Sequence, residues 1–301
     1  MSTEPPPASG PRQLARLIGA IVAPTSLITA LLYYFGWHHA YWFFDYFGVN
    51  STVLGLSTVD YLIRSLDALF VPMTVTAALG LLTFWGHDLL RTRLAGALGP
   101  RILRVLLPAL AGLGLLLTLG GLWSVFTSTF LSDHLALAPL SLALGVALLA
   151  YGVQLRRRSG SGAARARSGW APVAEWAAVF ALVGLSLFWA ANDYAAAVGR
   201  ARAQEFVAGL SGYPAVVLYS EHSLSLTAPG VMETRCHDAD AAYRFRYDGL
   251  KLMLQSGDQY VLLPEHWRPA DGVAIVLPRS GSVRLEFTPA ARGTGAAAPS
   301  C

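Results

Sequence analysis

One short segment gathers residues whose side chains could bind a metal ion: Cys236, His237, Asp238 and Asp240. Thiolate, imidazole and carboxylate groups are all metal ligands, but a site needs several of them to converge on one ion. Adjacent residues of an extended strand point to opposite faces, so they rarely share an ion. We therefore favour a polar loop, with a metal site as the alternative.

A second polar group, His38 and His39 with Asp45, stands beside a run rich in aromatic residues. Histidine titrates near neutral pH and ligates metals, so this group could bind a metal ion or sense pH. Polar residues among tryptophan and tyrosine are also typical of the headgroup layer of a bilayer, and we favour that second interpretation.

Glu175 is the one carboxylate inside a predicted membrane span. Because a charge in hydrocarbon is costly, such residues are candidates for a proton or ion relay. Glu175 lies five residues after Trp170, within about 8 Å of the predicted membrane boundary by helical rise. Contact with headgroups, or pairing with Arg104 or Arg167, is therefore the favoured alternative.

Four cations lie on predicted strands near the C-terminus: Arg244, Arg246, Lys251 and Arg284. As exposed residues they could form a basic patch for anionic lipid or an envelope polymer, although a solvated sheet face is favoured. The sequence contains no nucleophile elbow, zinc-protease motif or Walker loop. It therefore predicts no catalytic residue, no cofactor and no metal ligand set.

Membrane-spanning helices must position most of these residues. The chain of 301 residues is 54% hydrophobic and 13% charged, with a mean hydropathy of +0.47. A helix needs about 20 apolar residues to cross a bilayer. Runs of this kind predict five spans, over residues 17–37, 68–86, 105–126, 135–155 and 170–191. Residues 1–16 are predicted to be a disordered cytoplasmic tail.

The arginines indicate the orientation of these spans. Eleven lie on one side of the membrane in the predicted tail and loops, and Arg64 alone lies on the other. The positive-inside rule then places the N-terminus in the cytoplasm and the C-terminus outside, although Arg200 and Arg202 oppose this. The same bias explains the net charge of +4 without a nucleic-acid partner.

The first outer loop, residues 38–67, begins with an aromatic run over Tyr41–Phe47 that we expect to lie in the membrane interface. Ser57 and Asp60 have the spacing of a capping box and predict a helix from about Thr58. The segments YFGVN (46–50), LGLST (54–58) and DYLIR (60–64) resemble a stretch in uncharacterised multi-pass membrane proteins of GC-rich, actinobacterial-type bacteria. This resemblance covers about twenty residues and implies no known activity.

After a predicted stalk helix, 192–211, the pattern becomes β-like over 212–289, and 290–301 is predicted to be disordered. Alternation predicts strands over 213–220, 223–227, 243–247, 250–255, 259–263, 273–277 and 283–287. Turn residues predict hairpins at 256–258 and 278–282. Cys236 and Cys301 could pair outside the cytoplasm, but a free Cys236 is favoured.

The predicted fold is thus an integral membrane α-helical bundle of about five transmembrane helices with a small C-terminal β-rich (α+β) extracytoplasmic domain. We expect a plasma-membrane, non-enzymatic envelope anchor whose outer domain binds or senses an envelope protein, polymer or anionic lipid. A transporter or channel component, and a membrane-embedded enzyme, are the alternatives. Small residues four apart, Ser141 with Gly145 and Ala177 with Ala181, would pack the bundle or a dimer.

Overall fold

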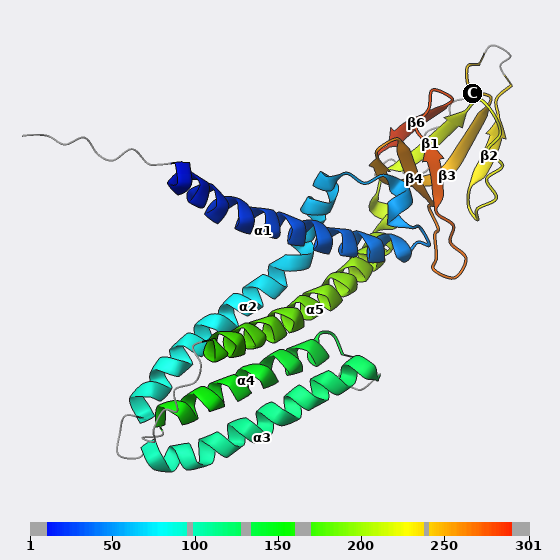
Figure 1. Ribbon diagram of the computed structural model, residues 1–301. Helices are drawn as coiled ribbons and strands as arrows, with labels where there is room; N and C mark the ends of the chain where they lie inside the picture. The colour runs from blue at the N-terminus through cyan, green and yellow to red at the C-terminus, as the bar shows by residue number, and fades with distance from the viewer. Residues whose placement is uncertain (1–10, 95–98, 128–133, 160–169, 238–240, 291–301) are drawn as a thin grey trace, which may run out of the picture. The chain divides into compact units, whose positions relative to one another are not determined.

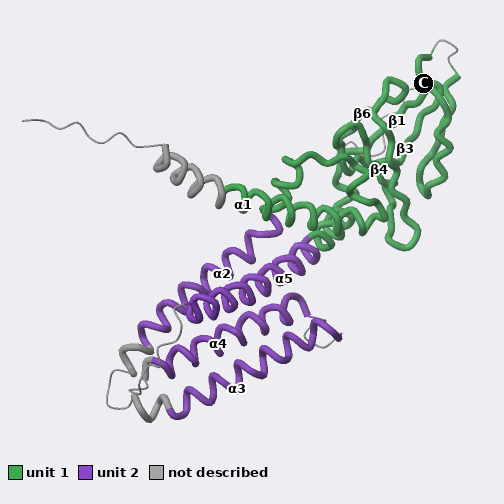
Figure 2. Tube along the Cα trace, in the orientation of Figure 1, with its two compact units in different colours: residues 1–66, 199–301 green, residues 67–198 purple. Residues whose placement is uncertain are grey.

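The computed structural model describes residues 11–94, 99–127, 134–159, 170–237 and 241–290. The chain forms two compact units: unit 1 comprises residues 1–66 and 199–301, and unit 2 comprises residues 67–198 (Figure 2). Most of both predicted tails lies outside the described residues, as do Asp238 and Asp240 of the predicted metal-binding group.

The described residues form five α-helices, α1 (Pro11–Asp45), α2 (Thr58–Leu94), α3 (Gly99–Phe126), α4 (Leu137–Ser159) and α5 (Ala171–Ala208) (Figure 1). Four segments are long and apolar enough to cross a membrane, namely Thr58–Leu89, Arg104–Phe126, Leu137–Arg157 and Ala171–Ala208. The multi-pass helical architecture is confirmed at this level. The side chains of residues 11–24 are outside the described part of the chain, so a span over 17–37 stays a prediction.

Helix ends differ from the prediction at two places. α1 begins at Pro11 and continues to Asp45, so residues 11–16 are helical and the aromatic run is not a loop. α5 continues unbroken to Ala208, which makes the predicted stalk part of the fifth helix. The predicted capping box is confirmed, since Ser57 N donates to Asp60 Oδ2 at 2.8 Å, Asp60 N donates to Ser57 Oγ at 3.2 Å, and α2 begins at Thr58.

In unit 2, α3 and α4 cross closely because small residues face each other. A Cβ on Gly121 would lie 2.8 Å from Ser141 Oγ, and a Cβ on Gly145 would lie 2.5 Å from the backbone N of Thr118. Ser141 and Gly145 therefore pack the bundle within one chain, the first of the two predicted uses of small residues. Ala177 and Ala181 are exposed.

The described part of unit 1 carries an antiparallel sheet of six strands, β1 (Ala215–Ser220), β2 (Met232–Arg235), β3 (Phe245–Ser256), β4 (Gln259–Pro264), β5 (Ile275–Pro278) and β6 (Val283–Thr288). The strand order is β5-β4-β3-β1-β6, and β2 pairs with β3. The hairpin at 256–258 is confirmed, because Ser256 pairs with Gln259 and Gly257 adopts a φ of 53°.

Several other predictions of strands and hairpins are wrong. Residues 223–227 form no strand. The strand β2 was missed because all four of its residues are exposed, so its sequence shows no alternation of apolar and polar residues. The segments predicted as 243–247 and 250–255 are one strand, β3. The hairpin predicted at 278–282 is instead a crossing, since β5 pairs with β4 and β6 pairs with β1.

This crossing requires a strongly curled sheet. Pro278 pairs with Gln259 of β4, which pairs with Ser256 at the end of β3. Val283 pairs with Ser220 of β1, which pairs with Phe245 at the start of β3. The chain from 278 to 283 reaches at most about 18 Å, whereas a straight strand as long as β3 would extend about 36 Å. β3 bends at Gly249, where φ is 84°, and its register shifts between Leu252 and Leu254.

The curled sheet encloses a core of Val216, Leu218, Ala228, Tyr247, Leu250, Leu262 and Ile275. The Tyr247 hydroxyl donates to Glu233 Oε2 at 2.9 Å and accepts from Leu224 N at 2.6 Å, so the buried phenol is satisfied. Cys236, also buried, is disulfide-bonded, which corrects the expectation of a free thiol. Cys301, the other cysteine of the chain, lies outside the described residues.

Candidate functional site

The aromatic end of α1 packs against the outside of the curled sheet. Phe44 and Phe47 are 0% and 4% exposed, and the Phe47 and Trp267 ring centroids are 5.0 Å apart. Within β4, Leu262 faces the sheet core, whereas Val261 and Leu263 contact the aromatic side chains of α1. We call this contact the junction. Phe44 and Phe47 are therefore covered by protein rather than by lipid headgroups, and a position of the run in the membrane interface stays a prediction.

Two glycines bring the helices of unit 1 together at the junction. Any Cβ on Gly36 of α1 would overlap the backbone carbonyl of Tyr61 on α2. A Cβ on Gly199 of α5 would lie 2.6 Å from the carbonyl oxygen of His39 and 3.2 Å from Phe43 N. Both crossings bring backbone against backbone, so the end of α1 is held by α2, α5 and the sheet.

The histidines of α1 lie in this packed region. Trp42 Nε1 donates to His38 Nε2 at 3.0 Å, and Arg200 stacks over the Trp42 ring at 3.7 Å. Burial, and secondly the charge of Arg200, lowers the pKa of His38, which favours the neutral ring that accepts this hydrogen bond. His39 is 3% exposed, whereas Asp45 at the end of α1 is exposed. These three described side chains do not form a group that could hold a metal ion.

Glu175 forms an ion pair in unit 2 with a residue that was not among its predicted partners. Arg157 Nη2 lies 2.8 Å from Glu175 Oε2, with side chains 45% and 39% exposed. The pair joins α4 to α5 near the end of the candidate span that closes at Arg157. The charge of Glu175 is thus offset by Arg157, rather than by Arg104 or Arg167 as the sequence suggested.

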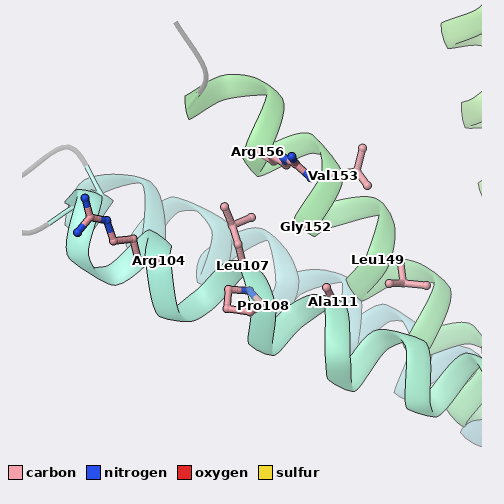
Figure 3. A pocket seen from close by; sticks show the side chains of 8 residues that line it. All are labelled: Arg104, Leu107, Pro108, Ala111, Leu149, Gly152, Val153 and Arg156. Atoms are coloured by element: carbon pink, nitrogen blue, oxygen red, sulfur yellow. The ribbon is translucent and has the colours of Figure 1, made fainter. Parts of the chain in front are cut away.

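A groove of about 430 Å³ lies between α3 and α4 in unit 2 (Figure 3). Arg104 on α3 and Arg156 on α4 lie toward the same end of the helix pair, because the helices run in opposite directions. The remaining lining residues are apolar or lack a side chain: Leu107, Pro108, Ala111, Leu149, Gly152 and Val153. The groove thus combines a cavity with two cationic side chains, Arg104 and Arg156.

The predicted basic patch on the sheet does not form as an exposed surface. Lys251 is 2% exposed, and its Nζ donates to Tyr213 O at 2.8 Å and lies 3.3 Å from Glu265 Oε1. Arg246 is 7% exposed and pairs with Asp248 at 2.8 Å. Arg284 is exposed and pairs with Glu286 at 2.7 Å. Of the four cations, only Arg244 is exposed and has no ion pair among the described residues.

Comparison with known proteins adds no identity. No family model, curated protein or solved structure matches this chain. Among the described residues, no three histidine, cysteine, aspartate or glutamate side chains are close enough to hold a metal ion.

Sequence reasoning missed both the junction and the groove. Arg104 and Arg156 belong to the eleven arginines whose distribution indicates the orientation of the spans. The cavity between them depends on two helices whose contact surface a single sequence does not reveal. Gly152 was a possible signal, because a glycine within an apolar run often marks a close approach or a gap.

Proposed function

We propose that this protein is a non-enzymatic cell-envelope anchor that holds its curled β-sheet at the outer surface of the plasma membrane for binding or sensing a partner. The junction carries the proposal. A domain that only needed tethering could follow a flexible linker, whereas here β4 is buried on both faces and packs on α1. Such packing transmits the position of the helices to the sheet.

Two observations support an extracytoplasmic sheet. The arginine distribution favours a cytoplasmic N-terminus and, after five crossings, an external C-terminus. The disulfide at Cys236 agrees, because disulfides persist mainly in oxidising compartments. The resemblance of residues 46–64 to bacterial multi-pass membrane proteins fits the same location, and we propose membership of that group.

Thiol labelling tests the orientation. Thr227→Cys, on the exposed surface of unit 1, should react with a membrane-impermeant maleimide on intact spheroplasts. Asp88→Cys, exposed near the predicted cytoplasmic end of α2, should react only after lysis. The reverse pattern would overturn the proposed orientation, and labelling of both before lysis would show that the spheroplasts were leaky.

An ion-flux measurement tests the anchor against a transporter. Glu175 is paired with Arg157 near a span end, so we expect proteoliposomes of the wild-type chain and of Glu175→Gln to show the same background proton and cation flux. A flux above empty liposomes that disappears in Glu175→Gln would contradict the anchor. A charge-matched control is Glu205→Gln, which breaks the exposed pair with Arg202 in unit 1.

A further inference from the structure

The groove between α3 and α4 is charged at one end and apolar at the other, as an amphiphilic ligand would require. Its charged end is marked by Arg104 and Arg156, and its apolar end by Ala111 and Leu149 (Figure 3). Each helix contributes seven residue steps between these ends, or about 10 Å at 1.5 Å per residue. The groove thus presents two cations and then about 10 Å of apolar wall.

The two arginines are available to an external anion. Both are exposed, and within the described ranges neither takes part in an ion pair, whereas the adjacent Arg157 is engaged by Glu175. A guanidinium group beside an apolar groove favours a phosphate, whose oxygens accept paired N–H donors. The side chains of Arg104 and Arg156 point in different directions (Figure 3), so each offers its own donors. Arg104 begins one candidate span, and Arg156 is the last residue but one of another, Leu137–Arg157. Both therefore lie at span ends, the depth of lipid headgroups.

Gly152 lines the groove without a side chain. A Cβ at this position would lie 3.5 Å from the Leu110 Cβ, an ordinary contact, so the backbone accepts an added methyl group there. The cavity of about 430 Å³ is within the usual range for small-molecule sites. In a membrane-spanning pair of helices, the molecule that meets such a surface is lipid.

We propose that this groove binds one anionic phospholipid, with the phosphate held by Arg156, positive charge added by Arg104 at the same end of the helix pair, and the start of an acyl chain along Leu107, Leu149 and Val153. The charge, the depth and the apolar lining each match one part of that molecule. The site is independent of the proposed anchor function and of the orientation of the chain.

Titration of the purified full-length chain with phosphatidylglycerol, followed by native mass spectrometry, tests the charged end. Arg156→Gln should weaken binding of the first lipid about tenfold, because a charge-assisted hydrogen bond is lost. The matched control is the neighbouring Arg157→Gln, whose exposed partner is already Glu175; its effect should stay below about threefold. Equal losses in the two variants would show non-specific charge attraction and overturn the site.

Two further arms separate the lipid from simpler ligands. Phosphatidylcholine with the same acyl chains should bind at least about tenfold more weakly than phosphatidylglycerol, since its net charge is zero. Soluble glycerol phosphate at millimolar concentration should not displace the lipid. Displacement would mean that the groove is a site for free phosphate compounds, and equal affinity for both lipids would mean a non-selective apolar surface; either result rejects the proposal.

A steric variant tests the position of the chain. Gly152→Leu should fill the groove and reduce phosphatidylglycerol binding about tenfold. Gly112→Leu, on a face of α3 where a Cβ meets open space, should not. Both variants should retain the helical circular dichroism and elution volume of the wild type, and unchanged binding by folded Gly152→Leu would show that the lipid lies elsewhere.

Discussion

Replacement of Trp267 by alanine is expected to lower the free energy of unfolding of the full-length chain by about 3–5 kcal/mol, the usual range for truncating a buried tryptophan. The ring is 5% exposed and packs between the sheet and α1, with centroids 5.0 Å from Phe47 and 5.7 Å from Tyr46. Truncation would leave a cavity that the stiff helix end cannot close. Chemical denaturation in detergent, followed by circular dichroism, measures the change.

The matched control is Phe287→Ala in β6, whose side chain is 56% exposed. We expect this change to cost less than about 1 kcal/mol, as for most exposed substitutions. Limited proteolysis gives a second measurement, because Trp267→Ala should make the sheet sensitive to protease at concentrations that leave the wild type intact. Equal stabilities of the two variants would show that the junction contributes little.

Gly36→Ala is expected to destabilise the chain by about 1–3 kcal/mol, as overpacking generally does. The added methyl group would overlap the carbonyl of Tyr61 and push α1 away from α2. Because the obstacle is backbone, no rotamer change relieves it. The same denaturation experiment measures the loss, and cysteine cross-linking between α1 and α2 would report the separation.

Gly80→Ala on α2 is the control, since a Cβ there meets nothing within 4 Å. In an open helical position alanine is favoured over glycine by up to about 1 kcal/mol, so this variant should be neutral or more stable. Opposite signs at the two glycines are the expected result. A stabilising Gly36→Ala would mean that the α1–α2 crossing is looser than described.

The helices could be predicted because the length and apolar composition needed to cross a bilayer are properties of each sequence segment by itself. The Ser57–Asp60 cap and the turn before Gln259 were also predictable, since their chemistry is local. The extent of α1 was not. Aromatic residues such as Phe44 suit a lipid interface and a protein core equally, and only the fold shows which of the two covers them.

Burial on β3 could not be predicted from alternation. Leu250 and Lys251 are neighbours and both are buried, because the bend at Gly249 and protein on both sides of the strand remove the solvated face. Lys251 donates there to Tyr213 O and pairs with Glu265, partners that are 38 and 14 residues away. A rule based on neighbouring residues cannot find such partners, and the same limit concealed the groove between Arg104 and Arg156.

The two covered faces of β4 have a practical consequence for anyone who wishes to study the sheet in water. In a fragment starting at residue 212, Val261, Leu263 and Trp267 would form an exposed apolar patch, and such patches favour aggregation. Fusing residues 36–56 ahead of the fragment, or replacing the stripe with hydrophilic residues, would be needed before crystallisation or ligand screening.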